Sequence, residues 1–565
     1  MFDNYGTNLR APKVDIHDFS LVPRSEVPRS SFIMEHQHKT TFSASQLIPV
    51  YCQEILPGDS FNVEMSAFCR LATPLYPLMD NMDLESFFFF VPNRLVWEHW
   101  QNFMGEQNNP TDSISYAIPQ IVSPTGGFAA FSLFDYFGLP TVGQVGAGNT
   151  VSINALPIRA YSLIVQEWFR DQNLDTAMAT GTTGTLAPGA KFLAQSDDGP
   201  DLYSNYPIFT VRKRHDYFTS CLPWTQKGNP VTLPLGSTAV VKTSATNTVT
   251  GTQNALQYLQ VSGSAIPGSN PTTLAVAPGG AAQYTTTTIT AGGGIYPSNL
   301  YADLSTATAA TINSIRLAFQ TQRLLERDAR GGTRYPEHLL SHWGVTSDDL
   351  RMFRPELLNH GKTPVNIAPV PQTSATNLTG GSSPMGTLSA VGTAVARHGF
   401  SHSFKEHGYV LGLVAIRNDK IYQQGLKRLW KRSTRYDFYL PVFAHLGEDS
   451  VFNYEIYCDG SANDSLTFGY QERWATYRYN RSYTTGFFRS TNPTPLDAWH
   501  LAQKFTALPA LNSTFLADDL GTTLQRNLAA TTAANNQQLI CDFFFREKAA
   551  RLMPAYSVPG LVDHF

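Results

Sequence analysis

Charged side chains are scarce in this sequence. Asp, Glu, Lys and Arg make up only 15% of its 565 residues, well below the roughly 25% of an average soluble domain. Lys and Arg number 41 against 44 Asp and Glu, which gives a net charge of −3. The chain as a whole therefore has no field that would gather a polyanion. Any nucleic-acid contact is expected to be local or to need a basic partner.

Cysteine and long apolar runs are scarce as well. The five cysteines are scattered, and none forms a CxxC pair, which argues against a disulfide framework and a structural zinc site. The longest apolar runs, such as Phe87 to Val91, are far too short to cross a membrane, and no export signal is visible. We expect a protein without membrane insertion, made and kept in a cytoplasm or in a particle assembled there.

Catalytic motifs are also missing. The run GKT at 361–363 resembles the end of a phosphate-binding loop, but Glu356 stands where that loop needs its first glycine. Carboxylates are sparse and show no close pair that would serve as general acid and base. The sequence therefore predicts no enzyme, no catalytic residue and no cofactor.

The histidines do not change this interpretation. His338 and His342 are four apart on an expected helix and share one face, but Leu339 stands where a metalloprotease has its glutamate. His398 and His402 lie on a strand-like run with a second shared face, and we interpret them as hydrogen-bonded interior or interface residues. No metal site is predicted, and a divalent cation that stabilises an assembly is left open.

Glycine, proline and aromatic residues are abundant instead, which is typical of short strands and many turns. Apolar and polar residues alternate over Phe61 to Ala67, Phe400 to Phe404 and Tyr409 to Ala415, and the runs DFYLPVFAHL and ATYRYN show a similar rhythm. Strands that are far apart in sequence, with long excursions between them, favour a mainly β fold, a sandwich of the jelly-roll kind.

Helices are expected at three places. Pro157 stands at the first position of a run whose apolar residues recur at helical spacing as far as Trp168. A second helix is expected from about Asn313 to Arg330, with Gly331 as its stop. Thr494 as a cap ahead of AWHLAQKF indicates a third helix.

Two stretches are almost free of charge. From Gly228 to Ala302, 75 residues contain a single charged side chain, Lys242, and the second stretch runs from Thr363 to Ala396. Threonine and valine favour ordered, strand-forming surface here. A flexible Gly/Ser/Thr linker between two domains is the alternative.

A basic cluster interrupts this low-charge sequence. Its five cations fall within nine residues, with aromatic residues between them. Guanidinium and ammonium groups beside aromatic rings are suited to gripping phosphates and stacking unpaired bases. A solvated basic face or an ion-pair patch between subunits is the alternative. The candidate contacts for a genome or a DNA-binding peptide are Lys427, Arg428, Trp430, Lys431, Arg432 and Arg435.

Several longer runs resemble gokushovirus major capsid proteins, and they occur in the order of that family. Examples are SFFFFVPNRLVWEHWQNFMGE, RYPEHLLSHWGV, SFKEHGYVLGLVAIRNDKIYQQGLKRLW, FGYQERWATYRYN, FRSTNPTPLDAWHLAQKF and MPAYSVPGLVDHF. The similar runs extend from near Arg29 to Phe565. In the two uncharged stretches we recognise no run of this family.

The resemblance implies a single domain over residues 1–565, an eight-stranded viral jelly roll with long loop insertions. Sixty copies would form a T=1 icosahedral shell around circular single-stranded DNA, assembled in the cytoplasm of a bacterial host and retained in the virion. Implied partners are a small basic DNA-binding protein, an internal scaffolding protein, a minor pilot protein and a receptor on the host surface.

The resemblance also assigns roles to two segments. Residues 228–302 look like an insertion that rises as a threefold surface protrusion and meets the host, and 363–396 look like a second loop insertion. The expected host contacts are Lys242, Tyr258, Tyr284 and Tyr296. The Pro-rich ending, with Tyr556, Pro559 and Phe565, is expected to lie across neighbouring subunits.

Two other classes of protein share parts of this composition. A secreted carbohydrate-active β-protein would have an export signal and a carboxylate pair. A host-binding fibre or adhesin would share the uncharged threonine-rich surface but would usually show repeats, and we find none. The capsid subunit is therefore the favoured function, with the fibre as its alternative.

Overall fold

A computed structural model describes residues 28–176, 198–231, 312–346, 354–373, 386–529 and 537–556, together with six short strands between Val240 and Asp303. The chain divides into two compact units. Unit 1 comprises Met1–Thr225 and Gly344–Phe565, and unit 2 comprises Gln226–Trp343.

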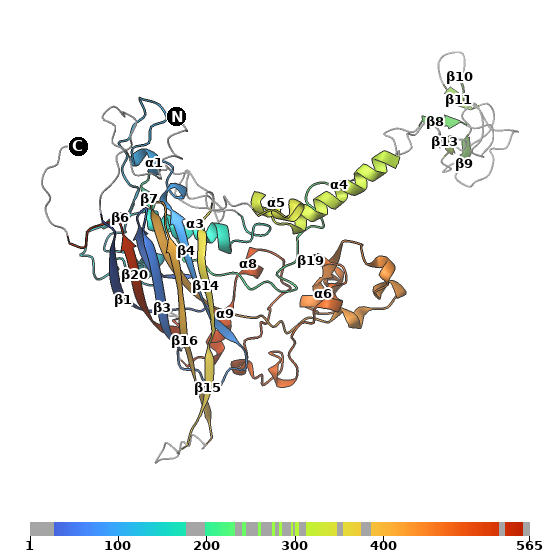
Figure 1. The fold of residues 1–565 in the computed structure, drawn as a ribbon. Coiled ribbons are helices and arrows are strands. Elements are labelled where there is room, and N and C mark those ends of the chain that lie inside the picture. Colours follow the sequence, from blue (N-terminus) through green and yellow to red (C-terminus); the bar gives the residue numbers. More distant parts are fainter. Residues whose placement is uncertain are drawn as a thin grey trace. The chain divides into compact units, whose positions relative to one another are not determined.

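Two antiparallel sheets build unit 1 (Figure 1). The five-stranded sheet has the order β1 (Ser30–Phe42), β20 (Leu539–Arg551), β3 (Ser60–Leu71), β16 (Leu388–Ser403) and β15 (Asn366–Pro371). The four-stranded sheet has the order β14 (Glu356–Pro364), β4 (Met82–Pro92), β17 (Gly408–Asn418) and β2 (Ile48–Ile55). Without β15, these eight strands have the paired order of a jelly roll, so the predicted fold class is confirmed.

The main core lies between the two sheets. Phe61, Val63 and Met65 of β3 point inward and are at most 1% exposed, while the residues between them are exposed or half-buried. Phe88 of β4 belongs to the same apolar cluster from the opposite sheet. The alternation expected for Phe61 to Ala67 is thus confirmed, because successive side chains of a strand point to opposite faces.

A second core covers the outer face of the four-stranded sheet. Phe89 of β4 packs there with Tyr161 of α3 (Leu156–Ile164). A π-helical turn, Val165–Phe169, continues this helix, as the spacing after Pro157 predicts. The same long β4–β14 connection contains α1 (Trp100–Phe103), β5 (Gln120–Val122), α2 (Leu133–Tyr136), β6 (Ser152–Asn154) and β7 (Asp201–Leu202). With a cover on each face, β4 is buried over its whole length.

The β17–β20 connection forms most of a third, smaller core around Tyr422 and Phe468, which Phe218 of the β4–β14 connection completes. Its elements are β18 (Glu448–Phe452), α6 (Asn453–Ile456), β19 (Thr467–Glu472), α7 (Ala475–Arg478), α8 (Ser513–Leu516) and α9 (Leu520–Leu524). The segment is thus mostly short turns and loops held together by aromatic side chains.

Three predictions in this connection are wrong. ATYRYN forms the short helix α7 instead of a strand, after Trp474 with a φ of 70°. DFYLPVFAHL contains a turn of 3₁₀ helix at Pro441–Phe443, because proline favours the first position of a helical turn. The helix expected after Thr494 is reduced to the single 3₁₀ turn Asp497–Trp499.

Unit 2 combines two helices with three nested strand pairs. The helices are α4 (Ile312–Arg330), which confirms the predicted helix and its glycine stop, and α5 (Tyr335–Trp343). The pairs are β8 (Val240–Thr243) with β13 (Leu300–Asp303), β9 (Tyr258–Gln260) with β12 (Ile295–Pro297), and β10 (Leu274–Val276) with β11 (Ala282–Tyr284). The described part of the first uncharged stretch is therefore paired strand.

The second uncharged stretch, expected to be a loop insertion with strand-forming surface, is described in part. Its described residues lie mostly in β15 and the first half of β16, which pair as an antiparallel hairpin. β15 is the last strand of the sheet and carries Pro369 and Pro371, opposite Ala390 and Leu388.

None of the helices in the described part of the chain has the length and hydropathy of a membrane span.

Candidate nucleic-acid interface

The basic cluster lies in the β17–β20 connection, on two turns of 3₁₀ helix. Arg428–Lys431 form the first turn and Arg435–Asp437 the second. Asp437 accepts hydrogen bonds from the backbone amides of Ser433 and Thr434 at 2.9 and 2.7 Å, and this fixes the start of the second turn. Short turns of this kind leave most side chains of the cluster at the surface.

Arg428 is committed to the fold. Its guanidinium lies 3.2 Å from Asp449 Oδ2, donates to the carbonyl of Ser450 at 3.1 Å and stacks over the ring of Phe452. Burial lowers the pKa of Arg428, but the charges of Glu455 and Asp449 raise it above its ordinary value. A cation held in this way has little capacity left for an external phosphate.

Three other cations rest on aromatic rings. Arg432 stacks 4.2 Å from the ring centroid of Tyr477. Lys427 lies 4.3 Å from the ring of Tyr483 and donates to the side chain of Asn480. Lys431 lies 5.5 Å from the ring of Tyr454. Cation–π contacts of this type leave one side of each cation open to a further ligand.

The remaining predicted contacts point outward. Trp430 is 72% exposed, and Arg435 and Lys431 are also classed as exposed. Tyr436, which follows Arg435 directly, is 67% exposed. An exposed indole and an exposed phenol beside exposed cations form a platform on which unpaired bases can stack.

Two cavities of about 420 and 490 Å³ share Arg428, Arg432 and Thr476 in their walls. The smaller cavity adds Arg478 and Arg481, and its only carboxylate is Glu455. Burial raises the pKa of Glu455 and lowers that of Arg481. The smaller cavity therefore contains an excess of positive charge, although the whole chain is close to neutral.

Sequence reasoning missed the arginines of this second segment. ATYRYN shows the alternation of a strand, and the prediction did not connect Arg473, Arg478 and Arg481 around it with the basic cluster. In the fold, they line the same two cavities as Arg428 and Arg432. The signal that could have found them is the alternation of arginine and tyrosine in RYNRSY.

The other predicted site residues lie on other elements of the chain. Lys242, Tyr258, Tyr284 and Tyr296 lie on the short paired strands of unit 2. Tyr556 is 84% exposed at the end of the described residues, and Pro559 and Phe565 lie outside them. His398 is a hydrogen-bonded histidine, as expected, between Ser86 and Thr363.

Within the described part of the chain, one group has the donor atoms of a metal site. It consists of Asp328, His338 and His342 in unit 2. The sequence predicted no metal there, because the motif of a catalytic zinc helix is incomplete.

Many exposed apolar side chains lie in the same connection as the basic cluster, between Leu429 and Phe487. Val442 is 88% exposed and Phe487 is 61% exposed. We call the following set the apolar patch: Leu429, Phe438, Tyr439, Val442, Leu446, Tyr477, Tyr479, Tyr483 and Phe487, all exposed. Exposed apolar surface on this scale usually marks an interaction site.

Comparison with known proteins identifies the class. Residues 20–561 match the family model described as capsid protein (F protein). Capsid protein VP1 of Bdellovibrio phage phiMH2K is 44% identical, over 97% of this chain and 98% of the relative. Those of Chlamydia phage 1 and Spiroplasma virus 4 are 38% and 34% identical, over 98% and 97% of this chain and 99% and 98% of the relatives. The chain therefore belongs to the capsid protein family of Microviridae phages, as a gokushovirus-like major capsid protein and a component of the virion.

Proposed function

We propose that sixty copies of this chain close into a T=1 shell around circular single-stranded DNA. The apolar patch of unit 1 carries the proposal. A free monomer with this many exposed aromatic side chains would be poorly soluble. Contact with a neighbouring subunit would remove them from water. Each contact can be modest, since the closed symmetry repeats it around every axis.

Assembly can be tested with a charge placed in the apolar patch. Val442→Asp should prevent shells, seen by electron microscopy and sedimentation, while the circular dichroism of the chain stays that of the wild type. Val142, which is 67% exposed and lies outside the patch, provides the matched control. Shells from Val442→Asp, together with none from Val142→Asp, would contradict the assignment.

We also infer that the basic cluster and the smaller cavity face the genome or a small basic protein bound to it. The cavity has five cationic side chains and one carboxylate. Arg432 Nε and Arg481 Nε are buried without a hydrogen-bond partner among the described residues. A phosphate would satisfy such groups. The net charge of −3 supports a basic partner for the bulk of the DNA charge.

Genome contact can be tested at the two exposed cations. Lys431→Glu with Arg435→Glu should lower the ratio of full to empty particles and weaken its salt dependence, by about one unit of slope for each lost phosphate contact. Lys405→Glu with Lys548→Glu makes the same charge change at exposed positions elsewhere. An equal drop in both double variants would indicate a net-charge effect and overturn the local assignment.

We assign residues 228–302, within unit 2, to the host surface as the threefold protrusion. The strand pairs of this segment are nested, so a deletion of residues 261–294 removes only the innermost pair, β10 with β11. Shells of this deletion should form and lose adsorption to the host. The resemblance also implies an internal scaffolding protein and a minor pilot protein as partners. The last residues of the chain are expected to lie across neighbouring subunits. Removal of residues 556–565 should then block assembly without unfolding the subunit.

A further inference from the structure

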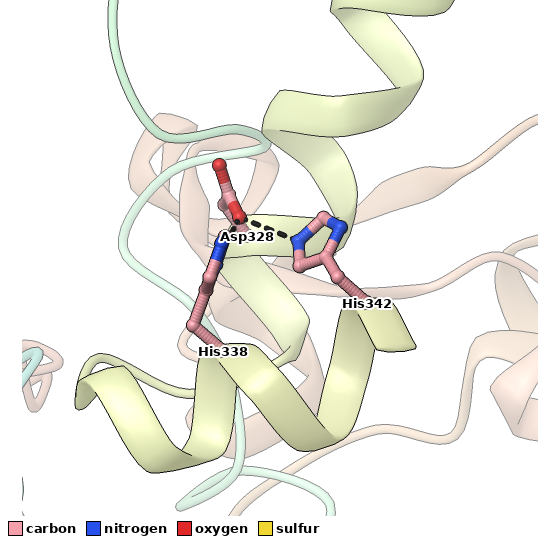
Figure 2. A group of neighbouring side chains, drawn as sticks. All are labelled: Asp328, His338 and His342. Carbon is pink, nitrogen blue, oxygen red and sulfur yellow. Dashed lines mark hydrogen bonds and ion pairs between the residues drawn. The ribbon is translucent and has the colours of Figure 1, made fainter. Parts of the chain in front are cut away.

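Two imidazoles converge on one carboxylate at the junction of α4 and α5 (Figure 2). Asp328 Oδ1, on α4, lies 2.8 Å from His342 Nε2 and 3.2 Å from His338 Nδ1. The two histidines are one helical turn apart on α5, and their ring centroids are 4.3 Å apart. All three donor atoms lie within 4.8 Å of one another. The three groups thus surround one point.

The turn between the helices holds this arrangement in place. Gly332 has a φ of +97°, which favours glycine, and a Cβ at Gly331 would lie 2.5 Å from Ser341 Oγ of α5. Glu337 Oε2 accepts from the backbone amides of Thr333 and Arg334 at 3.0 and 3.2 Å, and so fixes the start of α5. The histidines are therefore presented to Asp328 by a junction with little freedom.

We propose that Asp328, His338 and His342 bind a divalent transition-metal ion of the zinc class. Two neutral imidazole nitrogens and one carboxylate oxygen are ligands that zinc accepts in proteins. Bonds of about 2.0–2.2 Å around a tetrahedral ion put neighbouring ligand atoms about 3.3 Å apart. The two distances to Asp328 are already close to this value, so side-chain shifts on the order of 1 Å admit the ion.

The site is structural in character. The residue after His338 is Leu339, which cannot act as a base. The carboxylate of Glu337 accepts hydrogen bonds from the backbone of the turn, so neither residue is available as a general base beside the ion. Water fills the fourth position. The ion joins the last turn of α4 to the face of α5, and so holds the two helices of unit 2 to each other.

Without an ion, hydrogen bonds between the imidazoles and Asp328 hold the junction together. For both contacts to be hydrogen bonds, each imidazole must carry its proton on the nitrogen that faces Asp328. When the ion binds these nitrogens, each neutral ring carries its proton on its other nitrogen instead. Zinc also stabilises the folded junction by mass action, and the unfolding temperature should rise with the zinc concentration.

The test uses the full-length chain, treated with a chelator and then titrated with zinc chloride. The wild type should bind about one zinc per chain above the background of the double variant His338→Gln, His342→Gln, and each single variant should bind at least about tenfold more weakly. His445→Gln, at an exposed histidine outside the site, should bind like the wild type. Circular dichroism and shell formation check that every variant folds.

A replacement ligand separates coordination from simple hydrogen bonding. His342→Cys should retain zinc and, with cobalt, should give a thiolate-to-metal charge-transfer band that His342→Ala lacks. Equal zinc binding by the wild type and the double variant would overturn the proposal. So would a cobalt spectrum without this band in His342→Cys. Neither outcome depends on whether the shell encloses DNA, because metal binding and assembly are measured separately.

Discussion

The two sheets of unit 1 share one core but differ in what lies on their outer faces. β3, in the five-stranded sheet, alternates between buried inner residues and outer residues that are mostly exposed. β4, in the four-stranded sheet, is buried at every position because α3 and its neighbours cover the second face. The sequences reflect this difference: β3 alternates in polarity, whereas β4 contains the run FFFF. The pattern of a strand thus records how many of its faces are covered.

The covered sheet also buries charge. Glu85 of β4 is 2% exposed and is held by Arg214 and Arg417, which donate at 3.2 and 2.7 Å. On the open sheet, Glu35 of β1 pairs with Arg546 of β20, and both side chains are about half exposed. Similar ion pairs therefore stand in surroundings of very different polarity.

The largest expected effect comes from neighbouring phenylalanines of β4. Phe88 and Phe89 point to opposite faces, and each is 1% exposed. Phe88→Ala and Phe89→Ala should each lower the free energy of unfolding by about 4 kcal/mol, because both leave a cavity in a packed core. Urea denaturation of the unassembled chain measures the loss.

The matched control lies on the open sheet. Phe68 of β3 is 50% exposed, next to the buried Ala67. Phe68→Ala should lower the free energy of unfolding by about 1 kcal/mol or less. A loss as large as that of Phe89→Ala would mean that the outer face of the five-stranded sheet is covered within the subunit, and the comparison would fail.

A smaller effect is expected from the buried charge. Glu85→Gln should cost about 3 kcal/mol in the same measurement, because Arg417 and Arg214 each lose a buried carboxylate partner. Glu35→Gln, at the exposed pair, should cost less than about 1 kcal/mol. Equal losses in the free energy of unfolding would mean that solvent screens the two ion pairs alike. That result would contradict the role given to the burial of Glu85.

The smallest effect concerns the contact between the sheets. His398 of β16 reaches across to Ser86 of β4 at 2.6 Å and Thr363 of β14 at 3.0 Å. Burial, and then the charge of His360, lower the pKa of His398 below its ordinary value of 6.5. Just below pH 6.5, the unfolded chain binds more protons at this histidine than the folded chain does. The stability that neutral His398 contributes is therefore complete above that pH and is lost as the pH falls.

His398→Gln should therefore weaken the decline in stability between about pH 7.5 and 5.5. Thermal unfolding of the unassembled chain across this range measures the slope, and His445→Gln serves as a control at an exposed histidine. An unchanged slope in His398→Gln would assign the pH dependence to other groups.

Much of the fold could be predicted from the sequence, and the failures have a common cause. Phe61 to Ala67 was predicted correctly because one face of β3 meets solvent. DFYLPVFAHL and ATYRYN have strand-like composition, but their aromatic rings stack on cations in the β17–β20 connection. Tyr477, for example, lies under Arg432. Such contacts join segments far apart in sequence and leave no local period.

The candidate site was predictable only in part. The density of cations between Lys427 and Arg435 is visible in the sequence. The commitment of Arg428 to Asp449 is not, because it depends on a strand that the fold brings alongside. The convergence of His338 and His342 on Asp328 was likewise hidden, since the helical spacing showed the pair of histidines but not their partner on α4.

The two prolines of β15 have a consequence for how the particle holds together. Pro369 and Pro371 are alternate residues of an edge strand, so both lack their amide on the same side of it. A strand from a second molecule would find no main-chain donors at these positions. Fibre growth through continuous backbone pairing is blocked along this margin, and contacts made there between molecules must run through side chains.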